Sequence, residues 1–265
     1  MKTCLVAIIL LVGSVGAAVA QTVPPTAKPE DTEIYTPVPA TVTPGKISSD
    51  APSDALVLFD GKNLDQWTST DNPGALAPWT TTGGVLTVKK GTGNIQTKRS
   101  FGNYQLHLEW RVPANITGTG QARGNSGLFL ASLGKGDEGY ELQVLDSYSN
   151  KTYTNGMAGS VYKQTVPLVN PTRKPGEWQT YDVIWTAPTF SPSGTVTTPA
   201  RVTVLFNGVL VENNVTLLGP TLYIGKAAYS APHGPAPIKL QAHGDKSEPI
   251  SFRNIWIREL PAVSQ

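Results

Sequence analysis

The feature that most constrains the fold is a series of short segments in which apolar and polar residues alternate. In residues 104–112, one set of alternate positions holds Leu106, Leu108, Trp110 and Val112, and the other holds His107, Glu109 and Arg111. This two-residue period places the two sets on opposite faces of a β-strand. Comparable runs occur at 85–88, 126–130, 140–145, 181–185, 201–206, 238–241 and 251–257. We find no amphipathic helical segment of about ten residues, so the chain is predicted to be all-β.

Turn signals between these runs indicate how the strands connect. Asn207-Gly208 separates two apolar runs, and this dipeptide accepts the positive φ angles of a type I′ hairpin turn. Residues 191–199 are rich in Ser, Thr and Pro, and we interpret them as a long hairpin loop between neighbouring strands. Roughly a dozen strands in about 200 residues favour one large jelly-roll β-sandwich of two antiparallel sheets over two immunoglobulin-like domains.

The first twenty residues are typical of a secretory signal peptide. Lys2 precedes the apolar run 5–15, and an A-x-A cleavage site ends at Ala20. This run is shorter than the roughly 20 residues that a membrane helix needs. We therefore expect cleavage between Ala20 and Gln21, and a secreted or periplasmic protein with no membrane span.

Two regions follow the predicted signal peptide at 1–20. Residues 21–53 are rich in Pro and Thr and poor in bulky apolar residues, a composition that predicts an extended linker. Residues 54–262 contain the alternating runs and are predicted to form a single jelly-roll domain.

Composition excludes several classes of site and partner. The one cysteine, Cys4, lies in the signal peptide, so the mature chain has no disulfide, thiolate nucleophile or cysteine-bound metal. The net charge is +2 and there is no basic run, so nucleic acid is not an expected partner. The three histidines lie on separate segments, which disfavours a three-histidine zinc site.

Two predicted strands carry polar side chains on what we expect to be a common outer face. In residues 140–146, Glu141 and Gln143 share one face. In residues 237–244, the matching face carries Lys239, Gln241 and His243. A carboxylate and amides side by side suit sugar hydroxyls, whereas the alternative is an ordinary solvated strand face. His243 at a strand end is well placed for proton transfer.

Other polar residues are weaker candidates. Arg123 and Asn125 lie in a glycine-containing loop that enters a strand. Arg253 lies in a mainly apolar strand, where a half-buried arginine requires a carboxylate partner or a ligand. Asp146 either reaches the site, if its strand bends, or caps the turn that begins at Ser147.

The tryptophans divide into two groups. Three alternate with aliphatic residues and are expected in the core: Trp110, Trp185 and Trp256. Trp67 and Trp79 lie in less regular segments and are expected to be freer for exposure and for stacking on sugars.

Eight segments, in this order, resemble the 3-keto-disaccharide hydrolase domain family. They are Leu58-Phe-Asp-Gly-Lys-Asn-Leu64 with Trp67, Gly124-Asn-Ser-Gly-Leu-Phe129, Tyr140-Glu-Leu-Gln-Val-Leu-Asp146, Gly159-Ser-Val-Tyr162 with Pro167, Pro175-Gly-Glu-Trp178, Asn207-Gly208, Ile238-Lys-Leu-Gln-Ala-His-Gly244 and Phe252-Arg-Asn-Ile-Trp-Ile257. The resemblance covers residues 56–260. It implies a concanavalin A-like (laminin-G-like) jelly roll, in agreement with the strand pattern, and hydrolysis of glycosides that are oxidised at C3. Lys239 and Ala242 depart from it, in a stretch where the family often has Gly and Asp.

The implied reaction needs a base near C2 of the sugar, a positive or hydrogen-bonding group at the C3 oxygen, and an acid at the leaving oxygen. We expect either Glu141 or His243 to be the base. Candidates for the C3 oxygen are Arg253, Lys163 and Arg123. Candidates for positioning hydroxyls are Gln143, Gln241 and Asn125.

Three alternatives stay open at this point. A divalent cation such as Ca²⁺ could replace the cationic side chain, with Glu141, Asp146 and His243 as ligands. Glu109 and Glu141 could form the carboxylate pair of an ordinary glycosidase. The domain could also be a non-catalytic, lectin-like carbohydrate-binding module, because the same fold serves both functions.

Overall fold

The computed structural model describes residues 26–261 and divides into two units at Thr41. In the first unit, the described residues are exposed and extended except for one 3₁₀ turn, η1 (Pro29–Thr32). The predicted signal peptide and the first residues of the predicted linker lie outside the described residues. Within 26–261, no helix has both the length and the hydropathy needed to cross a bilayer.

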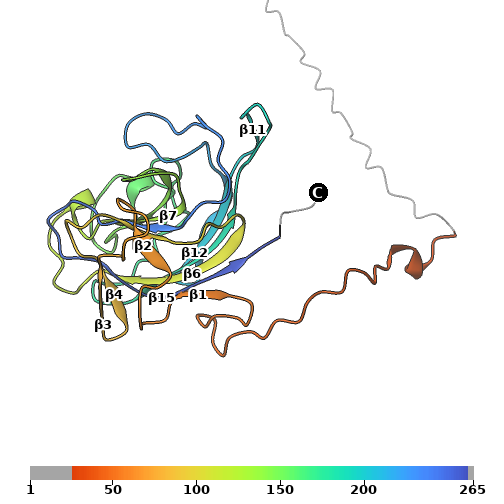
Figure 1. The fold of residues 1–265 in the computed structure, drawn as a ribbon, viewed down its shortest axis with the longest axis horizontal. Helices are drawn as coiled ribbons and strands as arrows, with labels where there is room; N and C mark the ends of the chain where they lie inside the picture. The colour runs from red at the N-terminus through yellow and green to blue at the C-terminus, as the bar shows by residue number, and fades with distance from the viewer. Residues whose placement is uncertain (1–25, 262–265) are drawn as a thin grey trace, which may run out of the picture. The chain divides into compact units, whose positions relative to one another are not determined.

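The second unit is a sandwich of two antiparallel sheets (Figure 1). The larger sheet has the order β13 (Val209–Thr216), β12 (Arg201–Phe206), β9 (Gln179–Thr186), β6 (Tyr104–Arg111), β15 (Ser251–Glu259), β4 (Val85–Thr87) and β3 (Thr80–Thr82), with β1 (Leu56–Phe59) also paired to β15. The smaller sheet has the order β2 (Trp67–Ser69), β5 (Ile95–Thr97), β14 (Lys239–Leu240), β7 (Ser126–Ser132) and β8 (Gly139–Val144). A separate hairpin joins β10 (Thr189–Phe190) to β11 (Val196–Thr198). The predicted all-β, two-sheet architecture is confirmed.

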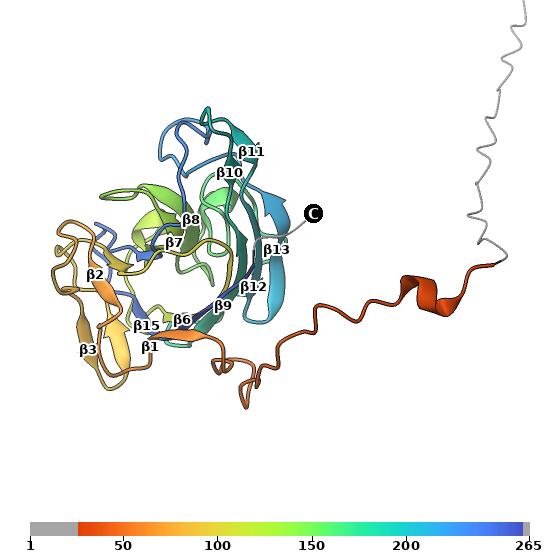
Figure 2. The ribbon, with the colours of Figure 1, turned by 45° about the vertical axis from the view of Figure 1, so that its right-hand side comes forward.

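The core lies between the two sheets, and Figure 2 shows the larger sheet curving around β7 and β8. The alternation in β6 has the predicted result, because Leu106, Leu108 and Trp110 are fully buried in the core. Two tyrosines of the larger sheet also reach across to backbone carbonyls of the smaller sheet. Tyr104 donates to the carbonyl of Leu130 at 2.6 Å, and Tyr181 donates to that of Gln143 at 2.7 Å.

Two tryptophans that the sequence pattern suggested as exposed are buried instead. Trp67 is 0% exposed and its indole donates to the carbonyl of Leu58, while Trp79 is 5% exposed and donates to that of Gly93. Backbone carbonyls satisfy each indole N–H, from strand β1 for Trp67 and from a loop for Trp79, so these rings fill the core at no polar cost and cannot stack on a sugar. The expectation of exposure is therefore wrong.

Both turn predictions are confirmed. Asn207 and Gly208 have φ angles of 52° and 78°, and Phe206 pairs with Val209 across the turn between β12 and β13. Strands β9 and β12 are antiparallel neighbours, and the loop that joins them folds into the β10–β11 hairpin.

Residues 42–53, which the composition assigned to the linker, belong to the second unit. The carbonyl of Ser49 accepts hydrogen bonds from Asn254 and from the indole of Trp256, each at 2.9 Å. Trp256 is buried, but under this segment on the outer face and not in the core as predicted, and it stacks on His107 with ring centroids 5.4 Å apart. This part of the chain therefore covers a polar cluster on the outer face of the larger sheet.

That cluster centres on a buried histidine between two carboxylates. His107 Nδ1 lies 2.7 Å from Asp182, and its Nε2 lies 3.8 Å from Glu109. Burial by itself disfavours the charged imidazole, but the hydrogen bonds to the two carboxylates outweigh burial and raise the pKa of His107 to about 9.

This arrangement makes the stability of the domain depend on pH. A histidine whose pKa is raised by folding stabilises the protein fully below its unfolded value of about 6.5, and this contribution is lost as the pH rises to about 9. Over that window, the contribution of His107 to the free energy of unfolding should fall by about 1.4 kcal/mol per pH unit. Urea denaturation at several pH values should show a smaller decline in His107→Gln than in the wild type. His233→Gln is the matched control, and equal declines in all three proteins would contradict the prediction.

Candidate active site

A cavity of about 680 Å³ opens on the outer face of the smaller sheet. Its volume lies in the range of small-molecule sites. It is lined by Gln121, Ala122, Asn125, Asp137, Glu141, Gln143, Tyr153, Tyr162, Thr221, Tyr223, Gln241, His243, Gly244 and Asp245. The lining is rich in amides and carboxylates, which are the groups that bind sugar hydroxyls.

Strand register explains why residues far apart in sequence meet here. Strand β7 lies between β14 and β8, and its Phe129 pairs with Glu141 on one side and with Lys239 on the other. Two residues earlier on β7, Gly127 pairs with Gln143, and the carbonyl of Gly127 accepts the backbone N–H of Gln241. The prediction that Glu141, Gln143, Gln241 and His243 share one face is therefore confirmed.

Gly127 leaves a gap in the middle of this face. A Cβ atom at this position would lie 2.6 Å from Glu141 Oε1 and 3.1 Å from a ring carbon of Phe129. Both distances are closer than van der Waals contact, so any side chain at Gly127 would displace the carboxylate of Glu141.

This gap gives a test of the site that leaves the fold intact. Gly127→Ala should lower activity on a carbohydrate substrate by about tenfold to a hundredfold, because a displacement near 1 Å in a site can cost about a hundredfold. Kinetics and circular dichroism would be measured together. Gly102→Ala, at a glycine outside the cavity lining with open space around it and no positive φ, is the control. Unchanged activity in Gly127→Ala would show that the position of the Glu141 carboxylate is unimportant.

Glu141 is the most perturbed carboxyl group in the cavity. The residue is 6% exposed, and among residues 26–261 no hydrogen-bond donor contacts its carboxylate. Burial raises the pKa of Glu141 to about 8; the nearby Asp137 carboxylate adds to the rise and the Lys239 ammonium opposes it. At neutral pH the group is mostly protonated, and it can donate a proton.

The amide side chains of Asn125, Gln143 and Gln241 form a second polar feature of the cavity. Gln143 Nε2 donates to Asn125 Oδ1 at 2.9 Å, and Asn125 Nδ2 donates to the carbonyl of Gln121 at 2.8 Å. The buried side-chain oxygens of Gln143 and Gln241 have no partner among the described residues. A buried carbonyl oxygen without a donor is costly, so these two atoms are suited to accept hydrogen bonds from sugar hydroxyls.

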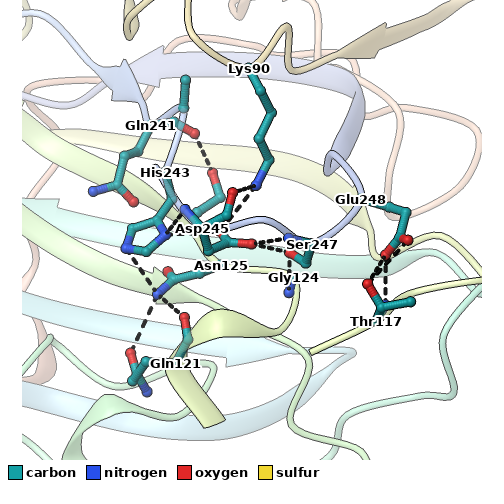
Figure 3. A network of polar contacts seen from close by, with 12 residues as sticks. Lys90, Thr117, Gln121, Gly124, Asn125, Gln241, His243, Asp245, Ser247 and Glu248 are labelled. Atoms are coloured by element: carbon teal, nitrogen blue, oxygen red, sulfur yellow. Dashed lines mark hydrogen bonds and ion pairs between the residues drawn. The ribbon is translucent and has the colours of Figure 1, made fainter. Parts of the chain in front are cut away.

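His243 is held by a buried carboxylate, as Figure 3 shows. Its Nδ1 lies 2.8 Å from Oδ2 of Asp245, whose side chain is 2% exposed. Burial disfavours the charge of Asp245, but hydrogen bonds from Ser247, His243 and Lys90 outweigh burial and lower its pKa. A charged Asp245 accepts a hydrogen bond from Nδ1–H, which leaves Nε2 as the unprotonated acceptor nitrogen of the ring. That atom lies 3.4 Å from Asn125 Nδ2.

Tyrosines form the opposite wall of the cavity. The hydroxyls of Tyr153 and Tyr162 are 2.6 Å apart. The exposed Lys163 places its Nζ 4.3 Å from the ring centroid of Tyr223 and 5.4 Å from that of Tyr162, and it donates to the carbonyl of Tyr223. Lys163 therefore lies against the rings of two tyrosines that line the cavity, Tyr162 and Tyr223.

Lys239 is a structural residue. It is 0% exposed, and its Nζ donates to the carbonyls of Gly134, Gly136 and Glu138 at 2.8–3.1 Å. These bonds hold the loop between β7 and β8, which contributes Asp137 to the cavity. The departure from the family pattern at this position therefore shapes the rim of the site.

Two candidate residues pair with each other and do not line the cavity. Arg123 Nε donates to Asp146 Oδ2 at 2.6 Å, and its Nη1 donates to the carbonyl of Ile116. The other oxygen of Asp146 accepts the N–H of Tyr148 at 3.1 Å, so Asp146 caps the turn after β8. This ion pair positions the loop that carries Asn125.

A third candidate, Arg253, lies on the far side of the sandwich. It is bound to Glu109 at 2.7 Å and stacks on Trp178, on the outer face of the larger sheet. Glu109 and Glu141 therefore lie on opposite outer faces with the core between them. They cannot flank one glycosidic bond, as the two-carboxylate mechanism requires.

The ligand set considered for a divalent cation is not assembled. Asp146 is engaged by Arg123, away from Glu141 and His243. More generally, the part of the chain that the structure describes contains no group of three or more His, Cys, Asp or Glu side chains placed to hold a metal ion.

Sequence reasoning missed several residues of the site. Asp245 follows His243 by two positions, and a His-x-Asp spacing next to a strand end was a usable signal. The aromatic wall of Tyr153, Tyr162 and Tyr223 comes from loops without a strand pattern, so no periodicity indicated it.

Comparisons with known proteins agree with this fold. Residues 54–258 match the 3-keto-alpha-glucoside-1,2-lyase-like domain. A crystal structure from Parabacteroides distasonis, named "putative glycosyl hydrolase", is 54% identical with a TM-score of 0.81, covering 88% of this chain and 97% of its own. A second structure of the same name and organism is 24% identical with a TM-score of 0.53, covering 78% of this chain and 99% of its own, and it supports the fold alone. No curated protein matches the chain.

The family match spans nearly the whole folded unit, and the crystal structure at 54% identity covers 88% of this chain. The chain therefore belongs to the carbohydrate-active family of 3-keto-alpha-glucoside-1,2-lyase-like domains.

Proposed function

We propose that this protein cleaves the glycosidic bond of sugars oxidised at C3, by elimination across C1 and C2 followed by addition of water. The observation that carries the proposal is the meeting of a His–Asp pair and a buried carboxyl group on one sheet face. A binding module needs neither group, whereas acid–base catalysis needs both. Membership of the family supports the choice of a 3-keto sugar.

The chemistry follows from the ketone. A carbonyl at C3 acidifies the C2–H bond, because the electron pair left by the proton is delocalised onto the C3 oxygen as an enolate. The enolate re-forms the ketone and expels the C1 substituent, which leaves a C1–C2 double bond. The leaving oxygen takes a proton from an acid. Water then adds at C1 and a proton returns to C2, so the net reaction is hydrolysis.

His243 and Glu141 suit the two proton-transfer roles. His243 lines the cavity, and its Nε2, which has only a 3.4 Å contact with Asn125 Nδ2, can accept the C2 proton, while Asp245 holds the ring and stabilises the imidazolium that forms. Protonated Glu141 can donate to the leaving oxygen. Of the two bases considered from the sequence, this assignment selects His243.

The C3 oxygen then needs hydrogen-bond donors. Burial and the contact with Tyr153 raise the pKa of Tyr162 further above its ordinary value, so its hydroxyl stays a neutral donor. Neutral hydroxyls in a dry site stabilise enolates effectively. With Lys163 beside them, these two tyrosines are our choice for the oxyanion, while the oxygens of Gln143 and Gln241 accept sugar hydroxyls.

Turnover in deuterated water tests the proposal. Incubation with a 3-keto-disaccharide should release the leaving sugar and place deuterium at C2 of the product, as measured by mass spectrometry and NMR. The unoxidised disaccharide should stay intact. Release without deuterium at C2 would exclude elimination, and tight binding without any release would support the carbohydrate-binding module instead.

A further inference from the structure

A second cavity of about 650 Å³ adjoins the first. Asp137, Thr221 and Tyr223 line both cavities. Thr221 is fixed to the strand that carries the acid, because its N–H donates to the carbonyl of Gly139 at 2.7 Å and its hydroxyl accepts the N–H of Glu141 at 3.0 Å. The boundary between the cavities is therefore rigidly placed.

The order of residues along β8 gives the direction of the second cavity. Gln143 and Glu141 line the first cavity, and Gly139, the next residue on the same face, lines the second. His243 lies beyond Gln241, at the opposite end of the first cavity from Gly139. Glu141 therefore lies between the base and the second cavity, where the oxygen of a leaving group would stand.

The two linings differ in chemistry. The first cavity is lined by several amides, whereas the described lining of the second contains no Asn or Gln. Its main side chains are apolar: Leu133, Pro220, Leu222, Ala231 and Pro232. Tyr223 adds an aromatic ring at the boundary. The lining also carries carboxylates and hydroxyls, from Asp137, Glu138, Thr221 and Ser230, so what distinguishes it is its larger share of apolar side chains, which suits an apolar ring.

Charge limits the occupant further. Asp137 and Glu138 contribute carboxylates to this cavity. Among the described lining residues, His233 is the one side chain able to carry a positive charge, and its ring is bound to Tyr140 at 2.8 Å and to the carbonyl of Gly234. An anionic group would meet repulsion without a matching cation.

We infer that the second cavity binds the leaving group of the substrate, and that this group is an uncharged aromatic alcohol. The inference rests on the proposed function, because it assumes cleavage between the two cavities. An aromatic alcohol fits the reaction as well as the lining, since a phenol with a pKa of about 10 leaves more readily than an aliphatic alcohol.

The test compares matched 3-keto-glucosides that differ at C1. The wild-type protein should show a kcat/KM for the phenyl compound at least about tenfold above those for the methyl compound and the 3-keto-disaccharide, since even one methylene in an apolar pocket is worth about tenfold. The 4-carboxyphenyl compound should fall below the phenyl compound. Equal values for phenyl and methyl, or a preference for the disaccharide, would overturn the inference.

Two variants distinguish binding of the phenyl ring in the second cavity from the better leaving ability of phenol. Leu222→Ser should lower the phenyl-to-methyl ratio of kcat/KM severalfold, whereas Ile224→Ser, at an 84% exposed residue outside both linings, should not change it. An unchanged ratio in Leu222→Ser would mean that the preference comes from the phenol alone, and the inference would fail.

Failure of the proposed function gives a different result. If no 3-keto compound is turned over, the affinities of phenyl and methyl glucoside would be compared by ligand-observed NMR. A phenyl preference that Leu222→Ser removes would support the aromatic subsite without the reaction. Equal affinities would overturn it.

Discussion

Replacement of His243 by Ala should reduce kcat/KM on a 3-keto-glycoside by about a thousandfold, within the range that one general base contributes to proton abstraction. The physical reason is the position of Nε2. The hydrogen bond of Nδ1 to the buried Asp245 orients the ring, which lines the cavity, and leaves Nε2 as the nitrogen that can accept a proton. No other described residue of the lining offers an equivalent unprotonated nitrogen.

The control for this variant is chemical rescue. The gap left by the missing ring opens on the cavity, so added imidazole should restore part of the turnover and of the deuterium exchange at C2. Affinity for a non-cleavable 3-keto analogue should change little, because the amides of Gln143 and Gln241 remain. Full activity of His243→Ala would remove the histidine from the mechanism. Asp245→Asn should give a smaller loss, since it misplaces the ring without removing it.

Replacement of Glu141 by Gln should also reduce kcat/KM strongly, by about a hundredfold or more. The amide has nearly the same shape but cannot donate the proton that the leaving oxygen requires. The loss should shrink for substrates with better leaving groups, because these need less protonation. A uniform loss across leaving groups would point to a structural effect of the substitution.

The pH profile distinguishes the two possible roles of Glu141. An acid must be protonated, so with a pKa of about 8 the wild-type kcat/KM should fall above pH 8. If Glu141 were the base instead, kcat/KM would rise through pH 8. Glu141→Gln should lack the limb that belongs to Glu141, whichever direction that limb takes.

Stability gives an independent measurement on the same variant. Folding raises the pKa of Glu141, so its contribution is fully present below the unfolded value of about 4.5 and is lost as the pH rises to about 8. Glu141→Gln should therefore become steadily more stable relative to the wild type over that window. A constant difference would mean that the carboxyl group is not buried as described.

Most of the fold was predictable from the two-residue periodicity of the sequence. Alternation in residues 104–112 and 140–145 predicted strands with one buried face, and Asn207-Gly208 predicted a hairpin. Both signals are local, since strand alternation and positive φ angles depend on a few neighbouring residues. Alternation also placed Glu141 on the same face as Gln143, and Gln241 on the same face as His243. Each of these two pairs was therefore predictable from its own segment.

The hydrogen-bond and ion-pair partners of individual side chains were not predictable in the same way. Arg123 and Arg253 were expected at the C3 oxygen, but each is engaged elsewhere by a carboxylate, Asp146 or Glu109. Trp67 and Trp79 were expected to be freer for exposure, but the backbone carbonyls of Leu58 and Gly93 accept their indole N–H groups and allow burial. These outcomes depend on which groups the folded chain brings within about 3 Å of each other.

The chain's own pattern thus determined an all-β domain and a polar strand face with a carboxyl group, amides and a histidine. The tertiary structure alone decided that β7 stands between β8 and β14, with Gly127 opening the gap in which Glu141 lies. It also decided that Asp245 is buried behind His243 and that loop tyrosines close the cavity. The physical reason is that strand faces follow from sequence spacing, whereas burial, which sets the pKa of Glu141, follows from contacts between distant segments.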